Sequence, residues 1–347
     1  MKRWRYLVGL GFILSIMLAF AASASANGKI MVYSPWKDEI MQKFGEMFQK
    51  ETGIKMESIN ISTGEIYARL KVEKARPQAD IWHSVRAELL DKAKEEGMLA
   101  PYKPTNSKYV LPLYTYPSEP TFTGTTMYPL VVGYNVNALK KMGAEPPKSY
   151  EDLLNPLWKD KIVMPHPAAS GTGYAFLVTI IQLYREKGET GTQSRKGWEY
   201  LAKLNQNMSQ YTRSGSAPAK LVATGEFPLC ITFYDRVFQL AEEGYPIAFT
   251  APSPTFAEPS CTAIVANAPD MDGAKKFMEL ILSKKAQELA VNMGNYSVRP
   301  DVDPPKGAIP LKDLKIFQDD YKWGSKYKKE ILNEFNSKVA MGKKTAQ

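Results

Sequence analysis

Cysteine and histidine are scarce in this chain. Among 347 residues there are two cysteines, Cys230 and Cys261, and two histidines, His83 and His166. They lie far apart and lack the short spacings of a zinc site, so we expect neither a resident metal nor a cofactor. Both cysteines fall in β-like runs, which leaves a disulfide and two buried thiols as open alternatives.

Motifs for phosphate loops and serine hydrolases are also missing. No G-x-x-x-x-G-K-[ST] segment occurs, and "AASGT" (168–172) does not match the G-x-S-x-G turn of α/β-hydrolases. His166 precedes Ser170 by four residues in a proline-flanked loop, which is more typical of a structural histidine. We therefore expect no enzymatic activity, and an exported hydrolase that uses Ser170 is a minor alternative.

Only the N-terminus carries a long hydrophobic run. Three basic residues within the first five positions precede the apolar segment 6–22, and Ala24-Ser25-Ala26 follows. This pattern predicts a secretory signal peptide over residues 1–26, cleaved after Ala26, with a membrane anchor as the alternative. No later segment is long and apolar enough to span a bilayer, so the predicted location is the periplasm.

The excess of positive charge is moderate. Removal of the three basic residues of the signal peptide leaves 42 Lys and Arg against 36 Asp and Glu, a net charge of +6. Such a surface favours small anionic ligands. The lysines of "KYKKE" (326–330) and "GKKTAQ" (342–347) do not form an aromatic-interleaved groove, so we expect no nucleic-acid partner.

Strand and helix patterns alternate along most of the chain. The segments 29–34, 54–60 and 79–84 read as strands, and each is followed by a segment with helical apolar spacing (37–53, 62–78 and 85–97). This alternation predicts an α/β fold with a parallel sheet and crossover helices.

A second α/β block follows an irregular stretch, and two extended crossings near 125–134 and 253–266 join the blocks. We expect a first lobe from residues 27–128 and 262–310 and a second lobe from residues 129–261. The segment 311–347 is expected to be helical and to pack on the lobes.

Small hydroxyl residues and glycines stand at four predicted strand-to-helix junctions. In open parallel sheets, ligands bind beyond the carboxyl ends of the strands, where helix N-termini attract anions. Helix capping alone explains any one such junction, whereas four together favour an anion-binding pocket. The junctions are Ser34, Ser62-Thr63-Gly64, Ser170-Gly171-Thr172 and Ser214-Gly215-Ser216.

Further polar residues lie close to these junctions. Arg213 stands beside the fourth junction, and Tyr234, Asp235 and Arg236 end another predicted strand. An arginine can hold a phosphate or carboxylate through two parallel bonds, and Asp235 can accept from sugar hydroxyls or an ammonium group. A surface Asp–Arg pair at the start of a helix is the alternative.

Six segments of the chain occur in the order "IMVYSPW", "STGEIYARLKVEKARPQADIW", "YPLVVGYN", "SYEDLLNPLWKDKIVMPHPAASGTGYAF", "AKLVATGEFPLCITFY" and "AKKFMELILSKKAQELAVNMGNYSVRPDV". In this order they resemble the bacterial extracellular solute-binding proteins of ABC importers, a family that includes ferric-iron, sugar-phosphate, phosphonate, polyamine and thiamine binders. The resemblance implies the type II periplasmic-binding-protein fold, with two lobes, two hinge crossings and a ligand between them. It also implies a monomer that serves an ABC permease and ATPase.

Within that family, the resemblance is closest to the sugar-phosphate and phosphonate branch. Ferric binders use an adjacent Tyr-Tyr pair where this chain has Phe233-Tyr234-Asp235. The predicted ligand is a small anionic, phosphorylated solute. Ferric iron held by Tyr234 with His83 or His166 is an alternative, as is a solute sensor without import. The expected lining is Ser34, Ser62, Thr63 and Ser84 from the first lobe and Ser170, Gly171, Thr172, Arg213, Ser214, Tyr234, Asp235 and Arg236 from the second.

Overall fold

The computed structural model of the chain describes residues 28–115, 120–340 and 345–346. The predicted signal peptide lies outside the described residues and stays a prediction. Within the described ranges, none of the helices combines the length and the apolar character needed to cross a membrane.

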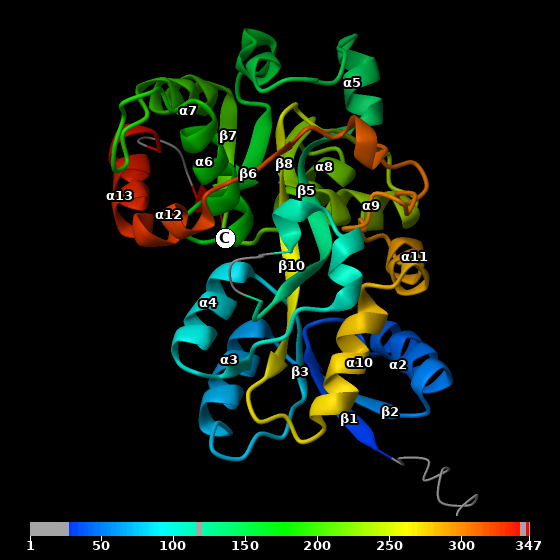
Figure 1. Cartoon of the computed structure of the whole chain (residues 1–347). Helices are drawn as coiled ribbons and strands as arrows, with labels where there is room; N and C mark the ends of the chain where they lie inside the picture. Colours follow the sequence, from blue (N-terminus) through cyan, green and yellow to red (C-terminus); the bar gives the residue numbers. More distant parts are fainter. Residues whose placement is uncertain (1–27, 116–119, 341–344, 347) are drawn as a thin grey trace, which may run out of the picture.

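Twelve strands of the described residues form one sheet that runs through the molecule (Figure 1). Its order is β12-β7-β6-β8-β5-β10-β3-β1-β2, with β4 and β11 paired to β10 and β9 paired to β5. The strands are β1 (Lys29–Ser34), β2 (Lys55–Asn60), β3 (Ile81–Val85), β4 (Leu99–Ala100), β5 (Thr123–Asn135), β6 (Ile162–Pro165), β7 (Met208–Thr212), β8 (Leu229–Phe233), β9 (Ile247–Thr250), β10 (Thr255–Val265), β11 (Ile316–Phe317) and β12 (Thr345–Ala346).

Helices cover both ends of this sheet (Figure 1). We call β1 to β4 with α2 to α4, α10 and α11 the first half, and β6 to β9 and β12 with α5 to α9 the second half. The helices are α2 (Asp38–Thr52), α3 (Thr63–Val72), α4 (Ala87–Glu95), α5 (Val136–Met142), α6 (Gly171–Leu183), α7 (Arg195–Asn207), α8 (Ala217–Ala223), α9 (Tyr234–Glu242), α10 (Met271–Ile281), α11 (Lys284–Asn292), α12 (Tyr321–Lys326) and α13 (Lys328–Lys338).

The first half has the parallel arrangement expected from its alternating pattern. Strand β1 pairs in parallel with β2 and with β3. Helix α2 buries Met41, Phe44 and Phe48, whose spacing places them on one face against the core. It ends at Gly53, whose φ of +74° is left-handed and whose N–H bonds the Gln49 carbonyl. The helix predicted over 37–53 is therefore confirmed.

The second half repeats the pattern around a more apolar helix. Strand β6 pairs in parallel with β7 and with β8. Helix α6 is buried continuously from Gly173 to Ile181, because it packs between the sheet and the outer helix α7 (Figure 1). An apolar helix enclosed on all sides holds its first residues in a fixed position.

Two long antiparallel strands connect the halves. Strand β5 pairs with β8 and β9 through its later residues and with β10 through its earlier ones. Strand β10 also pairs with β3, and its register shifts at Cys261. These strands occupy the two crossings expected near 125–134 and 253–266. The lobe boundaries drawn from the sequence stay a prediction.

The C-terminal segment contacts both halves. The Tyr321 hydroxyl donates to Asp91 of α4 at 2.7 Å, and the Tyr174 hydroxyl of α6 donates to the Gly324 carbonyl at 2.5 Å. Helices α12 and α13, red in Figure 1, lie beside α6 and α7. The segment is thus a third link between the halves, alongside β5 and β10.

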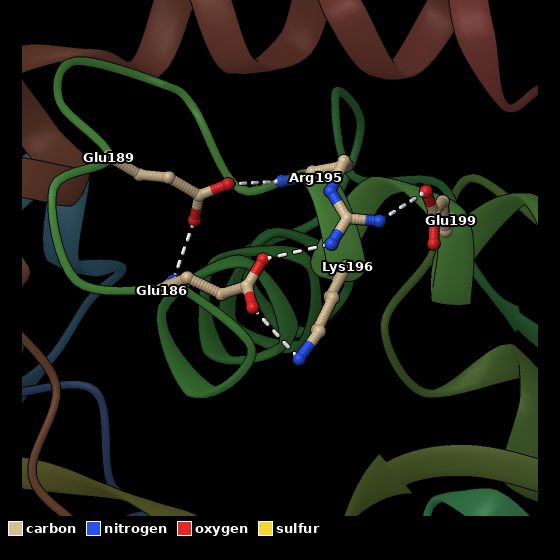
Figure 2. Close-up of polar contacts among 5 residues, drawn as sticks. All are labelled: Glu186, Glu189, Arg195, Lys196 and Glu199. Carbon is tan, nitrogen blue, oxygen red and sulfur yellow. Dashed lines mark hydrogen bonds and ion pairs between the residues drawn. The ribbon is translucent and has the colours of Figure 1, made fainter.

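The connection between α6 and α7 is held by polar contacts (Figure 2). The Glu189 carboxylate accepts from the backbone N–H groups of Glu186 at 2.6 Å and Arg195 at 2.7 Å. The Arg195 guanidinium pairs with Glu186 and Glu199, each at 3.1 Å. Lys196 pairs with Glu186 at 2.8 Å. Because these ion pairs are exposed, each adds little stability, and together they fix the course of the loop.

The structure decides between the disulfide and the two buried thiols that the sequence left open. Cys230 lies on β8 and Cys261 on β10, both within the described residues, and both are buried thiols that do not form a disulfide. Burial raises the pKa of the Cys230 thiol to about 12, so this thiol is protonated and unreactive at neutral pH.

Candidate functional site

A cleft of about 950 Å³ lies between the two halves. Its first-half wall comes from residues that follow β1 and β3 or begin α3. Its second-half wall comes from the starts of α6, α8 and α9, as expected for the carboxyl ends of parallel strands. The lining includes Trp36, Lys37, Thr63, Ser84 and Arg86 from the first half, Gly171, Thr172, Ser214, Gly215, Ser216, Asp235 and Arg236 from the second, and Tyr128 and Glu258 from the crossing strands.

The N-terminus of α6 opens into this cleft. Ser170 is its N-cap residue, in an extended conformation, and within the described residues its side chain makes no cap hydrogen bond. The first helical bond runs from the Tyr174 N–H to the Ser170 carbonyl at 3.0 Å. The N–H groups of the first turn, at Gly171 and Thr172, therefore present the positive end of the helix dipole to the cleft.

Arg86 reaches across the cleft to the start of α6. A Cβ atom on Gly171 would lie 2.3 Å from the Arg86 Nη1 atom, so glycine permits this approach. Arg86 Nη2 pairs with Glu258 at 2.6 Å and with Glu88 at 3.5 Å. A guanidinium beside a helix N-terminus is unfavourable on its own, because both are positive. An anion between them would bind both.

Two glycine-containing turns meet at the second-half wall. A Cβ atom on Gly215 would lie 2.9 Å from both the Ser170 Oγ and the Thr172 Oγ1. The Ser214 and Ser216 hydroxyls lie 3.0 Å apart in the same turn. The absence of a side chain at Gly215 thus allows four hydroxyl groups to gather beside the start of α6.

The opposite wall offers Thr63 and Ser84. Ser84 has a φ of +60°, a left-handed conformation that few serines adopt. Its hydroxyl lies 2.8 Å from the Ser260 hydroxyl on β10. Trp36, whose ring contacts His83 edge-on at 4.6 Å, adds an aromatic surface to the cleft.

Carboxylates also face the cleft and its edge. Burial raises the pKa of Glu258 to about 7, although the positive charge of Arg86 opposes the shift. Burial likewise raises the pKa of Asp235, against the effect of Arg236, which pairs with it at 3.4 Å. Burial raises the pKa of Asp319, which lines a neighbouring cavity together with Arg86, to about 7. The site therefore mixes cations with carboxyl groups that are easily protonated.

Seven of the residues expected from the sequence line the cleft, and others lie nearby. Ser170 lines a second cavity of about 330 Å³, which adjoins the cleft at Arg86 and Gly171. Arg213 is exposed and is not among the residues that line the cleft. The seven that the cleft brings together are Thr63, Ser84, Gly171, Thr172, Ser214, Asp235 and Arg236.

Two of the expected first-half residues have local structural roles instead. The Ser34 side chain is fully buried, and its Oγ accepts from the Trp36 N–H at 3.1 Å. Ser62 forms a capping box with Glu65: the Glu65 carboxylate accepts from the Ser62 N–H at 2.9 Å, and the Ser62 Oγ accepts from the Glu65 N–H at 3.4 Å. Neither side chain lines the cleft.

Tyr234 also lies away from the cleft. Its side chain is fully buried, and its ring packs against Phe238, Phe249 and Tyr296 with centroid distances of 4.7 to 5.5 Å. Burial raises the pKa of the Tyr234 hydroxyl far above its usual value. A phenolate at this position would therefore be costly.

Neither histidine lines the cleft. His83 is fully buried with its Nδ1 2.8 Å from the Thr262 hydroxyl, and burial lowers its pKa to about 3. His166 packs edge-on against Tyr211 and Phe335. Across the described ranges, no group of three or more His, Cys, Asp or Glu side chains is placed to hold a metal ion.

Sequence reasoning missed Arg86, Glu258 and the aromatic pair Trp36 and Tyr128. Arg86 follows β3 directly, at a strand end where ligands are expected to bind. It was overlooked because it is neither a hydroxyl residue nor a glycine, the residue types that indicate a ligand site at these strand ends. Glu258 and Tyr128 face one another in register on the crossing strands. They carry no local motif, and only the pairing of β5 with β10 brings them to the cleft.

Known proteins share this sequence and architecture. Residues 43–316 match the family described as bacterial extracellular solute-binding protein. The Fe(3+)-binding periplasmic protein of Serratia marcescens is 28% identical over 314 residues, which cover 86% of this chain and 88% of the relative. A putative 2-aminoethylphosphonate-binding periplasmic protein of Salmonella typhimurium is 24% identical over 306 residues, covering 84% and 85%.

A solved structure gives the same fold. The periplasmic binding protein AfuA of Actinobacillus pleuropneumoniae, solved with exogenous fructose-6-phosphate bound, superposes with a TM-score of 0.71 at 27% identity and covers 91% of this chain and 100% of its own. The mixed α/β periplasmic-binding-protein fold expected from the sequence is confirmed. The chain belongs to the bacterial extracellular solute-binding protein family and is a non-enzymatic, periplasmic substrate-binding component of an ABC importer that binds a small solute.

Proposed function

We propose that this protein captures a small anionic solute, such as a phosphorylated sugar or a phosphonate, between its two halves and delivers it to an ABC permease and ATPase. The observation that carries the proposal is the approach of Arg86 to Gly171, the first residue of α6. A guanidinium and a helix N-terminus that face the same space would both be stabilised by an anion.

Hydroxyl groups complete the proposed anion site. Thr172 and Ser214 lie beside the start of α6, and Thr63 and Ser84 lie on the opposite wall. Asp235 is placed to accept a hydrogen bond from a hydroxyl or amino group elsewhere on the solute. Because both halves supply donors, the ligand favours the closed arrangement in which all of them reach it.

The crossing strands β5 and β10 would act as the hinge, with the predicted lobes moving about them. Two related proteins support the ligand class, since AfuA was solved with fructose-6-phosphate and the Salmonella relative is named as a putative 2-aminoethylphosphonate binder. The export signal and its cleavage after Ala26 belong to the same proposal, because the importer takes its solute from the periplasm.

A ligand panel tests this proposal. The chain from Asn27 onward is melted with fructose-6-phosphate, 2-aminoethylphosphonate, inorganic phosphate and ferric citrate. A ligand at a hundred times its Kd adds about 2.7 kcal/mol to the free energy of unfolding, which raises the Tm by several degrees. Stabilisation by phosphorylated compounds is the expected result. Stabilisation by ferric citrate alone would contradict the proposal.

Ferric iron is the competing ligand, because a relative named as an Fe(3+)-binding periplasmic protein is 28% identical to this chain. If ferric citrate does bind, a visible tyrosinate band that disappears in Tyr234→Phe would assign the metal to Tyr234. We expect no such band, because the Tyr234 hydroxyl is buried in an aromatic cluster.

A substitution in the cleft supplies the matched test. Thr172→Leu puts an apolar branch beside the α6 N-terminus and is expected to abolish binding of the solute without changing the fold. Thr190→Leu is the control, because Thr190 is exposed on the loop after α6, outside the cleft. Unchanged affinity in Thr172→Leu would remove Thr172 from the proposed site.

A further inference from the structure

The Arg86 guanidinium, which lines the cleft, lies close to both a carboxylate and the start of α6. Arg86 Nη2 is 2.6 Å from Glu258 Oε1, whereas Arg86 Nη1 is directed to Gly171 at the start of α6. The Glu258 side chain is only 13% exposed. An anion bound at the start of α6 would therefore share Arg86 with a carboxyl group that is almost out of water.

The groups around Glu258 are mostly acidic. Glu88 comes from α4, Asp319 from the segment before α12 and Asp235 from α9, and each raises the pKa of Glu258 beyond the effect of burial. Arg86 is the cation that opposes them. Further charged or titratable neighbours are Tyr128, opposite Glu258 on β5, Tyr321 of α12, which lines a small cavity together with Glu258, and Arg236, which pairs with Asp235.

Adding an anion makes the charged form of Glu258 still less favourable. The anion is a like charge within the same enclosed site, and it draws on the same guanidinium. We propose that Glu258 takes up a proton from the solvent when an anion binds at Arg86 and the start of α6, so that capture of the solute is coupled to protonation of this side chain. The inference rests on the proposed function, because the anion occupies the same site.

The reaction balances with water as the proton source. Protein, anion and one proton give the complex, the only covalent bond formed is the O–H bond of the Glu258 carboxylic acid, and no electron is transferred. In the complex, the O–H group of the neutral carboxylic acid can donate a hydrogen bond to the anion. Its carbonyl oxygen still accepts from Arg86.

The sign of the pH dependence follows from this balance. With a pKa of about 7 in the unliganded protein, Glu258 is half protonated at pH 7 and fully protonated well below it, so Glu258 contributes no pH dependence to the affinity at low pH. Above pH 7 the affinity falls, by about fivefold between pH 7 and pH 8 when one proton is taken up. A phosphomonoester, with a second pKa near 6, is a dianion throughout this range and does not cause the fall.

Calorimetry on the chain from Asn27 onward tests the coupling. Fructose-6-phosphate is titrated at pH 7.0 to 8.5 in two buffers that differ in ionisation enthalpy. We expect uptake of about one proton at pH 8 in the wild type and none in Glu258→Gln, whose affinity stays constant over this range. Glu226→Gln is the matched control, because Glu226 is exposed and lies outside the cleft, and it keeps the uptake.

A second measurement follows the titration of the Glu258 carboxyl group directly. In the unliganded wild type labelled with ¹³C at glutamate carboxyls, one resonance titrates near pH 7, and phosphate moves its midpoint upward. Asp319→Asn, which removes a negative neighbour, moves that midpoint downward. The resonance is absent from Glu258→Gln, which assigns it.

The outcomes separate this inference from the proposed function. If the anions bind and proton uptake is equal in the wild type and Glu258→Gln, the coupling is wrong and the anion site stands. A Glu258 resonance that titrates near 4.5 overturns the coupling in the same way. If none of the probe anions binds between pH 6 and pH 8.5, the proposed function fails and the coupling fails with it.

Discussion

The strand-to-helix junctions of the two halves use the same residue types in different ways. In the first half, the Ser62 hydroxyl caps α3, and the Ser34 hydroxyl closes the turn before α2. In the second half, over the residues described, Ser170 leaves the start of α6 without a side-chain cap. A serine before a helix therefore indicates a ligand site only where it leaves the first-turn N–H groups for a ligand.

The two junctions also differ three residues further along. Ser62 is followed at the third position by Glu65, which completes a capping box. Ser170 is followed at the third position by Gly173, where a Cβ atom would lie 2.3 Å from the Pro165 carbonyl oxygen. A glutamate cannot occupy that position without moving β6. The close approach of α6 to β6 therefore excludes a capping box at the start of α6.

The strongest test of the second-half junction removes its cation. Arg86→Ala is expected to weaken binding of fructose-6-phosphate about 300-fold, equivalent to about 3.5 kcal/mol, because it deletes a charged donor and leaves Glu258 buried without a cation. Calorimetry at pH 7 gives the Kd values. Arg213→Ala is the control, since Arg213 is exposed outside the cleft. Equal losses in both variants would indicate long-range attraction and no specific contact.

Glu258 should also affect the unliganded protein. Its folded pKa of about 7 lies above the unfolded value of 4.5, so its stabilising contribution is complete below pH 4.5 and is lost as the pH rises through 7. The free energy of unfolding of the wild type relative to Glu258→Gln is expected to fall by about 3 kcal/mol between pH 4.5 and pH 7. Urea denaturation at several pH values measures it. Parallel curves for the two proteins would contradict the raised pKa.

The sequence predicted the fold better than the site, for physical reasons. The spacing of the apolar residues and Gly53 were enough to predict α2, because local spacing determines which face of a helix is buried. Arg86 and Glu258 are 172 residues apart and meet only through the pairing of β10 with β3 and β5. No local pattern contains that contact. Tyr234 was placed correctly at a strand end, but the phase of α9 turns its side chain into the core.

A pair of small substitutions compares the two junctions directly. Thr172→Ala, in the second half, is expected to weaken fructose-6-phosphate binding about tenfold through loss of a hydrogen bond to a charged group, with little change in stability. Ser62→Ala, in the first half, is expected to lower the free energy of unfolding by about 1 kcal/mol with affinity unchanged, because only a cap is lost. Calorimetry and urea denaturation on both variants give the four values. A loss of affinity in Ser62→Ala would place Ser62 in the binding site.

The smallest effect on stability is expected at Glu65, which completes the capping box with Ser62. Hydrogen bonds from the Ser62 side chain and backbone lower the pKa of Glu65 below its usual 4.5. The carboxylate therefore stabilises the folded protein above pH 4.5, and this stabilisation is lost as the pH falls through the lowered value.

Glu65→Gln should differ from the wild type in its free energy of unfolding less than Ser62→Ala does, since an amide oxygen can still accept from the Ser62 N–H. The difference should shrink between pH 6 and pH 3 in urea denaturation, whereas the difference for Glu258→Gln changes mainly above pH 4.5. If Glu65→Gln instead altered ligand affinity, the first-half junction would bind the solute as well as cap its helix, and the contrast between the halves would no longer hold.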